Sequence, residues 1–421
     1  MAQRDLDVVV FGATGVTGRR VAAYLAERAP ETGASWAAAA RNPDKLASEL
    51  DAEGVSAPET IVADLEDPDS LAAMAARARV VLNLVGPYTI HGRPVVEACV
   101  ANGAHYCDLS GEMPFVREIL DDFDARATEA GVKLVQVCGF ESLPPDMAMT
   151  LATEAGRERW DEDLVEVDLE ASVRLPGVPR PSDVISGGTF QSMAEAAGCD
   201  DPSSVTDPAA LITDPALADE VRRRSPITLR PRRGARGAVI AAMQPAAFIN
   251  PAVIHRSAAL AADAAQRPSK PFRYREGVAM PGGAASLPFR YAAAGAIGGM
   301  QAALGAGTRA GPGARRRIAG AMRRVLPSSG FGPSPDRLEG WRWSMWLNAR
   351  TEGGNQVTVD VDAEGHPGYL ATARMLGEAG LLLAEDGATP DRAGHLTPAT
   401  AVGTGSVERF ERARLRFSVG A

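Results

Sequence analysis

The sequence of 421 residues has little lysine and few cysteines, and both shortages exclude kinds of chemistry. Lysine stands only at positions 45, 133 and 270, which argues against a catalytic lysine. The four cysteines are Cys99, Cys107, Cys138 and Cys199. They form no CxxC pair and have no histidine at metal-ligand spacing, so we expect neither a metal site nor a disulfide framework. A reducing compartment is therefore the expectation.

The sequence also has no excess of basic over acidic residues. The chain has 44 Lys+Arg against 53 Asp+Glu, which gives a formal net charge of −9 and argues against a dedicated nucleic-acid binder. The first seven residues are mostly polar and lead directly into an apolar run of strand length at residues 8–11. This pattern does not predict a signal peptide, so we expect a cytoplasmic protein. The length suffices for two domains.

Strand-like and helix-like segments alternate through the first third of the chain. The predicted strands are residues 6–11, 35–40, 60–63, 79–84, 104–108 and 132–137. The predicted helices are residues 16–28, 68–76, 94–101 and 114–130, with one more starting at residue 43. This order is typical of an α/β protein with a doubly wound parallel sheet of the Rossmann type, which we assign to residues 1–145.

The pattern changes after residue 145. Apolar and polar residues alternate at 164–173, and again at 341–347 and 355–361, which look like an antiparallel pair. Residues 369–383 have a helical pattern. We therefore predict a second domain of the α+β class over residues 146–365, which would hold the substrate, and a C-terminal segment over residues 366–421.

A glycine-rich turn follows the first predicted strand and opens the first predicted helix. It reads Gly12-Ala13-Thr14-Gly15-Val16-Thr17-Gly18. Small residues at this spacing let backbone amides approach a pyrophosphate at a helix N-terminus. Such glycines also serve plain tight turns, but the position at the first strand–helix junction favours a dinucleotide site.

The identity of the dinucleotide depends on the end of the second strand. An NAD site usually has an acidic residue there, whereas this chain has Arg41, which suits the 2′-phosphate of NADP(H). The alternative is that Arg41 only caps a surface loop. We expect Asp64 to lie beside the adenine, and Asn83, Gly86 and Pro87 to run beneath the nicotinamide ribose.

Three loops at strand ends offer candidate catalytic groups. They contain Tyr88 and His91 after the fourth strand, Asp108, Ser110 and Glu112 after the fifth, and Glu141, Ser142 and Asp146 after the sixth. Tyr88 is our first candidate for a proton donor or a carbonyl hydrogen bond, and His91 is the second candidate, because histidine is a common general acid or base. The alternatives are a packing aromatic at Tyr88 and a capping or exposed side chain at His91. We expect Asp108 and Glu112 to order their loop through backbone amides. The later motif Ser186-Gly-Gly-Thr189 fits either a carboxylate or cofactor-amide site or a plain helix cap.

Several motifs carry a resemblance to a known family. They are Gly12-Ala-Thr-Gly-Val-Thr-Gly18, Asn83-Leu-Val-Gly-Pro-Tyr88, His105-Tyr-Cys-Asp-Leu-Ser-Gly-Glu112, Cys138-Gly-Phe-Glu-Ser-Leu-Pro-Pro-Asp146, Ser186-Gly-Gly-Thr189 and Leu396-Thr-Pro-Ala-Thr400. With them the chain resembles the saccharopine dehydrogenase-like NADP-binding oxidoreductases, and within these the trans-acting enoyl reductases of polyketide-lipid biosynthesis. The resemblance implies C-terminal helices that pack back on the Rossmann domain, and reduction of an enoyl thioester or similar lipidic double bond.

An uncharged stretch in the second domain bears on the substrate. Residues 291–308 have no formal charge and lie between two arginines, but their glycine content makes a membrane span unfavourable. We expect a helix or flap over an apolar channel, with contact to a membrane surface, or else a loose loop. The basic stretches 222–224 and 230–236 would suit an acidic acyl carrier protein or an anionic head group, or are simply solvated.

Three functions remain open at this point. The first is an NADPH-dependent reductase of a lipid-like substrate, delivered by an acyl carrier protein or a polyketide synthase. The second is a saccharopine-type imine reductase, whose polyanionic substrate would need several convergent arginines or lysines. The third is a non-catalytic NADP-binding, lipid-associated protein, which would bind the dinucleotide without turnover.

Overall fold

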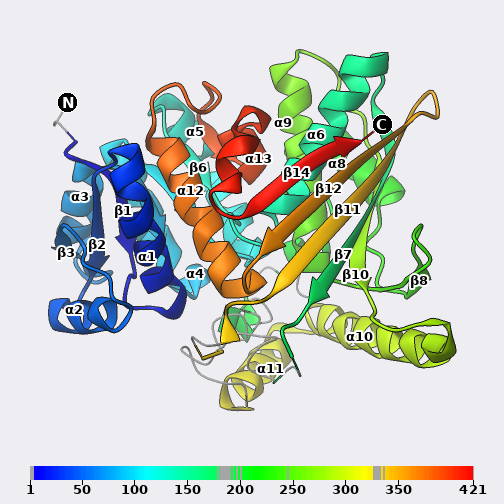
Figure 1. The fold of residues 1–421 in the computed structure, drawn as a ribbon, viewed down its shortest axis with the longest axis horizontal. Coiled ribbons are helices and arrows are strands. Elements are labelled where there is room, and N and C mark those ends of the chain that lie inside the picture. The colour runs from blue at the N-terminus through cyan, green and yellow to red at the C-terminus, as the bar shows by residue number, and fades with distance from the viewer. Residues whose placement is uncertain are drawn as a thin grey trace.

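Two seven-stranded sheets, with helices between and around them, make up the computed structural model (Figure 1). It describes residues 4–177, 180, 191–192, 194–195, 198–199, 202–243, 246–325, 333–334 and 337–420. The motif Ser186-Gly-Gly-Thr189 lies outside the described residues, so its predicted role is not addressed by the structure.

The first sheet is parallel throughout and has the strand order β13-β6-β5-β4-β1-β2-β3. Its strands are β1 (Leu6–Phe11), β2 (Trp36–Ala40), β3 (Thr60–Val62), β4 (Ala78–Asn83), β5 (His105–Asp108), β6 (Lys133–Val135) and β13 (Gly394–Leu396). The intervening helices are α1 (Val16–Thr32), α2 (Pro43–Ala52), α3 (Pro68–Arg77), α4 (Tyr88–Asn102) and α5 (Met113–Glu129). The predicted doubly wound Rossmann sheet is therefore confirmed, with a seventh strand added from the far end of the chain.

Cap residues in the sequence set several of these helix boundaries. The side chain of Asn42 accepts the N–H of Lys45 at the start of α2, and that of Asp67 accepts the N–H of Ser70 at the start of α3. α4 ends at Gly103, whose φ of 70° is the left-handed conformation that favours glycine. Local sequence thus fixes where the chain turns back toward the next strand.

The second sheet is mixed and has the strand order β14-β12-β11-β7-β10-β9-β8. Its strands are β7 (Leu164–Arg174), β8 (Arg232–Arg233), β9 (Val239–Ala241), β10 (Arg273–Ala279), β11 (Arg342–Thr351), β12 (Gln356–Glu364) and β14 (Leu415–Gly420). β11 and β12 form the predicted antiparallel pair, with Met345 opposite Val361 and Leu347 opposite Val359. β7 and β10 are parallel neighbours.

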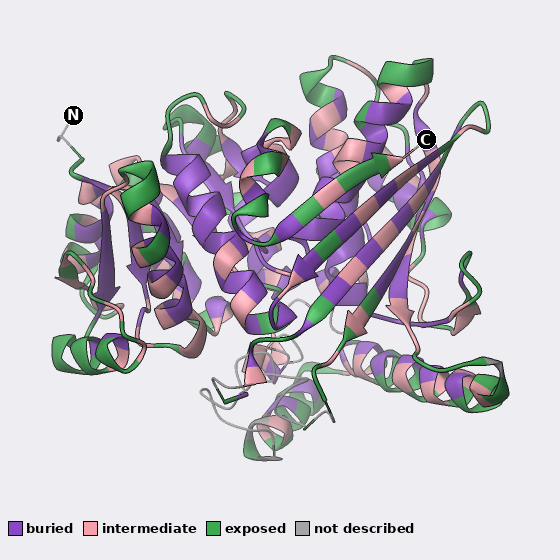
Figure 2. Cartoon of the chain, in the orientation of Figure 1, coloured by how far each residue is buried: buried purple, intermediate pink, exposed green. Residues whose placement is uncertain are grey.

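The remaining helices follow β6 in the chain. They are α6 (Leu143–Trp160), α8 (Pro215–Arg224), α9 (Asn250–Ala264), α10 (Leu287–Gly307), α11 (Pro312–Val325), α12 (Thr372–Ala384) and α13 (Pro398–Val402). Short 3-10 turns occur at Ser203–Thr206, Ala246–Phe248, Ala284–Ser286 and Thr404–Glu411, and a π turn at Pro367–Ala371. α6 packs against β11 and β12, and α12 packs against α1 and β4. Figure 2 shows buried residues alternating with intermediate or exposed residues along β11 and β12.

The C-terminal segment contributes to both sheets. α12 lies on the Rossmann unit and β13 pairs with β6, whereas β14 pairs with β12 in the second sheet. One apolar core accordingly includes Val10 of the first sheet and Val359 of the second. The proposed domain boundaries at residues 145 and 365 stay predictions.

Candidate functional site

The glycine turn between β1 and α1 is too tight for side chains at two of its positions. A Cβ on Gly12 would lie 2.8 Å from Cγ2 of Val85, and the φ of 90° at Gly12 is itself one that glycine favours. A Cβ on Gly18 would lie 2.2 Å from the carbonyl oxygen of Gly12. Gly15 is less restricted, with its virtual Cβ 3.3 Å from the same oxygen. These contacts let helix α1 start directly against the end of β1.

The N-terminus of α1 is open to an anion. Gly15 is the N-cap and offers no side-chain oxygen, and the first turn of α1 contains no acidic residue. The first helical hydrogen bond runs from the N–H of Arg19 to the carbonyl of Gly15 at 3.1 Å. The N–H groups of the preceding turn therefore have no helical acceptor, and the helix dipole favours negative charge there. The loop that runs from Gly12 through Ala13, Thr14, Gly15, Val16 and Thr17 to Gly18 fits the pyrophosphate of a dinucleotide.

Arg41 lies at the same edge of the sheet as this loop. β1 and β2 are parallel neighbours with Phe11 opposite Ala39, so the residues just after both strands emerge side by side. Arg41 is exposed, and its guanidinium makes no ion pair with any residue that the structure describes. An exposed arginine beside a turn with free helical amides has the chemistry to pair with the 2′-phosphate of NADP(H), and this role of Arg41 stays a prediction.

Asp64 follows β3 and shapes its own turn. One carboxylate oxygen accepts the backbone N–H of Glu66 at 3.1 Å, and the backbone N–H of Asp64 donates to the Ser70 hydroxyl at 3.0 Å. The side chain is only partly buried and therefore accessible to a ligand at this edge. Its predicted place beside the adenine stays a prediction.

The turn after β4 is held by the buried side chain of Asn83. Its Nδ2 donates to the Tyr106 hydroxyl at 3.1 Å, and its Oδ1 accepts the N–H of Val85 at 3.1 Å. Gly86 and Pro87 follow at the carboxyl ends of the parallel strands and are joined by a cis peptide bond. Asn83 thus sets the path of the segment that was predicted to run beneath the nicotinamide ribose, a role that stays a prediction for all three residues.

Tyr88 is buried and its hydroxyl is engaged in the described conformation. The hydroxyl donates to the carbonyl oxygen of Asn83 at 3.2 Å, and the ring stacks on Phe115 with centroids 6.2 Å apart. Burial, and secondarily the charge of Asp108, raise the pKa of Tyr88 well above its usual value, which keeps the hydroxyl protonated. His91 lies in the same first turn of α4 and is partly exposed. Catalytic roles for Tyr88 and His91 stay predictions.

Glu112 caps helix α4 from the loop after β5. One carboxylate oxygen accepts the N–H of Tyr88 at 2.9 Å and the Ser192 hydroxyl at 2.7 Å, and the other accepts the N–H of Thr89 at 2.8 Å. Because both backbone donors belong to the first turn of α4, the carboxylate meets the positive end of the helix dipole. The interpretation that Glu112 orders its loop through backbone amides is confirmed by this geometry.

Asp108, at the end of β5, also accepts hydrogen bonds from the backbone amides of loops. Its carboxylate accepts the N–H of Ser110 at 2.9 Å, the N–H of Val137 at 3.3 Å and the Tyr106 hydroxyl at 2.7 Å. Burial raises the pKa of Asp108 to about 7, although these hydrogen bonds oppose the shift. The loops after β5 and β6 are therefore joined through a single carboxyl group.

Sequence reasoning missed a buried acid on the second sheet, Glu276 of β10. Its Oε2 accepts Nδ2 of Asn250 and the Tyr274 hydroxyl, both at 2.8 Å, whereas its Oε1 has no partner among the described residues. Burial raises the pKa of Glu276 to about 7. Oδ1 of Asn250 in turn accepts the hydroxyl of Ser142, the residue that precedes α6, at 2.8 Å. No local pattern in the sequence marks Glu276, because its burial depends on α9, which contributes the partner Asn250.

Asp146, part of one of the sequence motifs, bridges three helices. Its carboxylate accepts the hydroxyl of Ser257 on α9 and, at 2.8 Å, the N–H of Ala399 on α13. Burial raises the pKa of Asp146 to about 7. Among the residues that the structure describes, no group of three or more His, Cys, Asp or Glu side chains could hold a metal ion.

The comparisons with known proteins agree with this site. The family model described as "Saccharopine dehydrogenase NADP binding domain" matches residues 8–135. A Mycobacterium tuberculosis protein named as a candidate trans-acting enoyl reductase is 34% identical over 97% of this chain and 96% of its own length. The trans-acting enoyl reductase of Mycobacterium ulcerans is 32% identical over the same shares.

The fold also matches a solved structure. Saccharopine dehydrogenase (L-Glu forming) from Saccharomyces cerevisiae superposes with a TM-score of 0.51 over 99% of this chain and 100% of that chain, at 13% identity. At this identity the match shows the fold alone. Together with the full-length relatives and the NADP-binding domain, it establishes that the chain belongs to the trans-acting enoyl reductase family of NADP(H)-dependent oxidoreductases, which is built on the saccharopine dehydrogenase fold.

Proposed function

We propose that the chain reduces the activated carbon–carbon double bond of a lipid-like enoyl thioester with NADPH. The observation that carries the proposal is full-length similarity to trans-acting enoyl reductases, together with the glycine turn and Arg41 of this chain. We further propose that residues 1–145 hold the cofactor and residues 146–365 hold the substrate.

The residues of this chain would act at three places. The backbone amides of the glycine turn bind the pyrophosphate, and Arg41 pairs with the 2′-phosphate. Bound NADPH supplies a hydride to the double bond. Tyr88, with His91 in the same first turn of α4, would hydrogen-bond the thioester carbonyl and hold the proton for the α-carbon, next to the carbon that receives the hydride. For this, the Tyr88 hydroxyl must exchange its bond to the Asn83 carbonyl for one to the substrate.

The partner and the location are part of the proposal. A reductase that acts in trans on a lipid-like chain would receive it from an acyl carrier protein or a polyketide synthase. The basic helix end Arg222-Arg223-Arg224 is exposed and would attract an acidic carrier. We also propose that the protein associates peripherally with a membrane.

A test measures NADPH oxidation by absorbance with a panel of enoyl thioesters, on coenzyme A and on an acyl carrier protein. We expect turnover with at least one long-chain member and a higher kcat/KM for the carrier-bound form. NADPH binding without oxidation of any member would contradict the proposal and favour a non-catalytic protein. Oxidation only with an amino acid and an aldehyde together would favour a saccharopine-type imine reductase.

Replacement of Arg41 by aspartate tests the cofactor site directly. We expect NADPH affinity to fall by about 10- to 100-fold, the worth of a charge-assisted hydrogen bond, with NADH affinity nearly unchanged, because only NADPH carries the 2′-phosphate. Titration of each cofactor by intrinsic fluorescence measures both values. Arg342→Asp, at an exposed arginine of β11, is the control and should leave both affinities unchanged. Equal losses for NADPH and NADH in Arg41→Asp would place the 2′-phosphate elsewhere.

A further inference from the structure

Helix α10 has the reverse of the usual polarity for a surface helix. Its polar side chains Arg290 and Gln301 face inward and are buried, together with Ala294, Gly298 and Gly305. The exposed positions of the helix carry no polar side chain; they are Leu287, Pro288, Phe289, Ala292, Ala296, Gly299, Met300, Ala302, Ala303 and Ala306. A helix at the surface of a soluble protein normally turns its polar residues to water. The outer face of α10 is therefore an apolar surface that nothing covers among the described residues.

The inner face anchors α10 firmly, so the apolar face has a fixed direction. A Cβ on Gly298 would lie 2.1 Å from the carbonyl oxygen of Leu229, which shows how closely the backbones approach. The guanidinium of Arg290 donates to the carbonyl oxygen of Met280 at 2.7 Å. α10 also packs along β9. In Figure 1, α10 and α11 lie together at one end of the molecule, below the second sheet.

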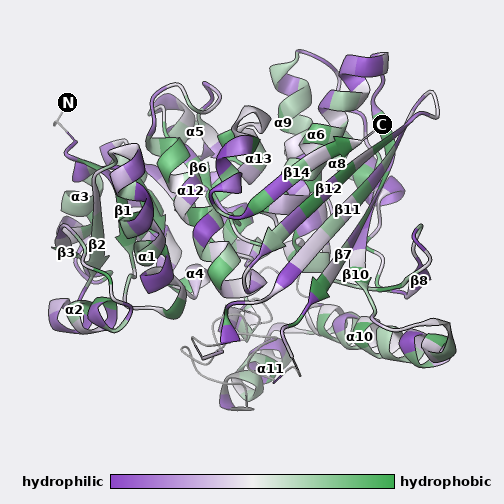
Figure 3. Cartoon of the chain, in the orientation of Figure 1, coloured by the Kyte–Doolittle hydropathy of each residue, from purple (hydrophilic) through white to green (hydrophobic). Residues whose placement is uncertain are grey.

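Two large side chains dominate the outer face. Phe289 is 75% exposed and Met300 is 51% exposed. They are eleven residues apart, which is about three helical turns, so they point in nearly the same direction. Figure 3 shows α10 as mostly hydrophobic along its length, unlike the charged α11 beside it. Ile318 of α11 adds an exposed apolar side chain among arginines.

The charged residues of the segment that contains α10 and α11 are of one sign only. No aspartate or glutamate occurs between Gly277 and Pro335, whereas the same stretch contains seven arginines: 290, 309, 315, 316, 317, 323 and 324. The whole chain has a net charge of −9, so the basic segment contrasts with the rest of the protein. Arg309, Arg316 and Arg317 are exposed. An apolar helix face beside exposed arginines suits a surface that is both hydrophobic and anionic.

We propose that the outer face of α10 and the exposed Arg316 and Arg317 of α11 dock on the surface of an anionic lipid bilayer, with α10 lying in the plane of the interface. Phe289 and Met300 would enter the boundary between head groups and acyl chains, and Arg316 and Arg317 would meet the phosphates. A protein partner is disfavoured because a protein interface of this size carries several direct hydrogen bonds, for which this face has no side-chain groups. No helix among the described residues is long and apolar enough to cross a membrane, which leaves the in-plane arrangement.

This inference deepens the proposed membrane association and does not require the proposed reductase activity. Co-sedimentation of the full chain with vesicles tests it, using phosphatidylcholine alone and phosphatidylcholine mixed with phosphatidylglycerol. We expect binding to the anionic vesicles that weakens with salt, and a loss of at least about tenfold in the double variant Phe289→Asp, Met300→Asp. Arg316→Glu with Arg317→Glu should abolish the preference for anionic over neutral vesicles.

Two further variants keep the test decisive. Val62→Asp, at an exposed apolar residue of β3 that is 56% exposed, is the matched control and should bind vesicles like the wild type. Phe289→Trp preserves the apolar face, and its added fluorescence should shift to shorter wavelength when anionic vesicles are added. NADPH oxidation with a water-soluble enoyl thioester should be the same in the wild type and the double variant, which separates docking from chemistry.

Three results would overturn the proposal. They are absence of wild-type binding to anionic vesicles, equal binding by the double variant, and no spectral shift for Phe289→Trp. A wild-type dimer in light scattering that becomes a monomer in the double variant would assign the face to a second copy of this chain instead.

Discussion

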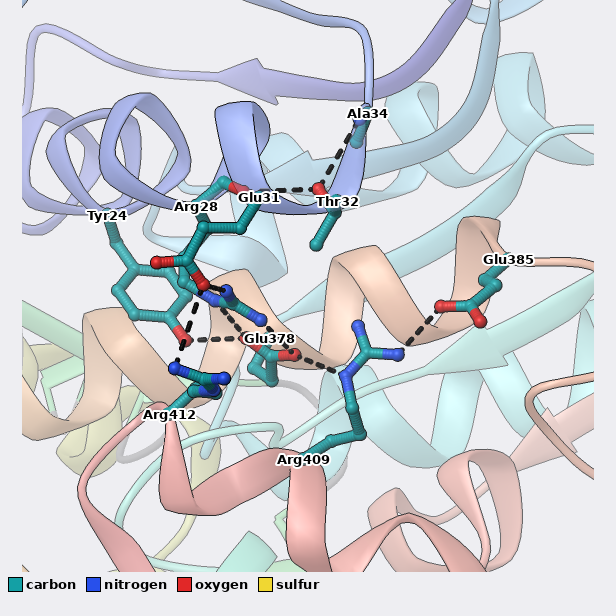
Figure 4. A network of polar contacts seen from close by, with 9 residues as sticks. All are labelled: Tyr24, Arg28, Glu31, Thr32, Ala34, Glu378, Glu385, Arg409 and Arg412. Carbon is teal, nitrogen blue, oxygen red and sulfur yellow. Dashed lines mark hydrogen bonds and ion pairs between the residues drawn. The ribbon is translucent and has the colours of Figure 1, made fainter.

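Replacement of Glu378 by alanine is expected to lower the free energy of unfolding by about 3–5 kcal/mol, the cost of leaving a buried charge without its partner. Glu378 lies on α12 and its side chain is fully buried (Figure 4). One carboxylate oxygen accepts the Tyr24 hydroxyl at 2.5 Å and Nε of Arg28 at 3.2 Å. The other accepts Nε of Arg409 at 3.0 Å. One carboxylate therefore joins α1, α12 and the 3-10 turn Thr404–Glu411.

The size of the effect depends on Arg28, which is itself buried on α1. Without Glu378, the ion pair with the half-exposed Glu31 is the one that remains for its guanidinium among the residues that the structure describes. Urea titration followed by circular dichroism measures the change. Glu385→Ala is the matched control, because Glu385 is 54% exposed and contacts only the outer side of Arg409, so its loss should cost less than about 1 kcal/mol. Equal losses in the two variants would mean that the network contributes no more than a surface ion pair.

The same network bears on the cofactor site. α1 carries the glycine turn at its N-terminus and the Glu378 contacts near its C-terminus. Gly377, next to Glu378, approaches Tyr24 so closely that a Cβ would lie 2.5 Å from the ring. The direction in which α1 points its free amides is thus fixed from the far end of the chain. We expect Glu378→Ala to weaken NADPH binding indirectly, because α1 loses the contacts that fix its direction.

The parts of the fold that sequence could predict are those with local signals. β1, β2 and β4 are mostly buried on both faces, so they appear as mainly apolar runs. The caps at Asn42, Asp67 and Gly103 mark the turns between elements. β13 has three residues, too few for any periodicity, and pairs with a strand far away in sequence. Its place in the first sheet could not be predicted.

The candidate site also has some features that follow from local sequence and others that depend on distant contacts. The glycine turn and Arg41 were predictable, because the loop conformation and the strand end are set by neighbouring residues. The inward direction of the Tyr88 hydroxyl was not, because it depends on the path of the Asn83 turn. The burial of Glu276 and Asp146 depends on contacts with α9 and α13, far apart in the sequence. The sequence shows that residues 291–308 have no charged side chain. Which face of the helix is exposed becomes clear only from the burial of Arg290 and Gln301.

Replacement of Glu276 by glutamine is expected to change how stability depends on pH. The pKa of Glu276 is raised from its ordinary 4.5 to about 7 by burial, so the folded protein holds this proton more tightly than the unfolded chain. The stabilisation is complete below about pH 4.5 and is lost as pH rises to about 7, after which the loss is constant. A shift of this size corresponds to about 3 kcal/mol. Glutamine stays neutral, so the variant should gain about that much relative to the wild type between pH 4.5 and pH 8.

Comparing the stability of the wild type and Glu276→Gln across pH separates the titration of Glu276 from the other effects of the substitution. The glutamine amide meets no acceptor where Oε1 of Glu276 has no partner, but this cost does not depend on pH and cancels in the difference. Asp108 and Asp146 also have raised pKa values, and they titrate equally in both proteins. Glu162→Gln is the control: the hydrogen bond from Thr351 lowers the pKa of that partly exposed carboxylate, so its difference in stability from the wild type should be constant above about pH 4.5 and should shrink only in acid. Parallel stability curves for wild type and Glu276→Gln would mean that Glu276 is already ionised at pH 5, and that water or a cation reaches its unpartnered oxygen in solution.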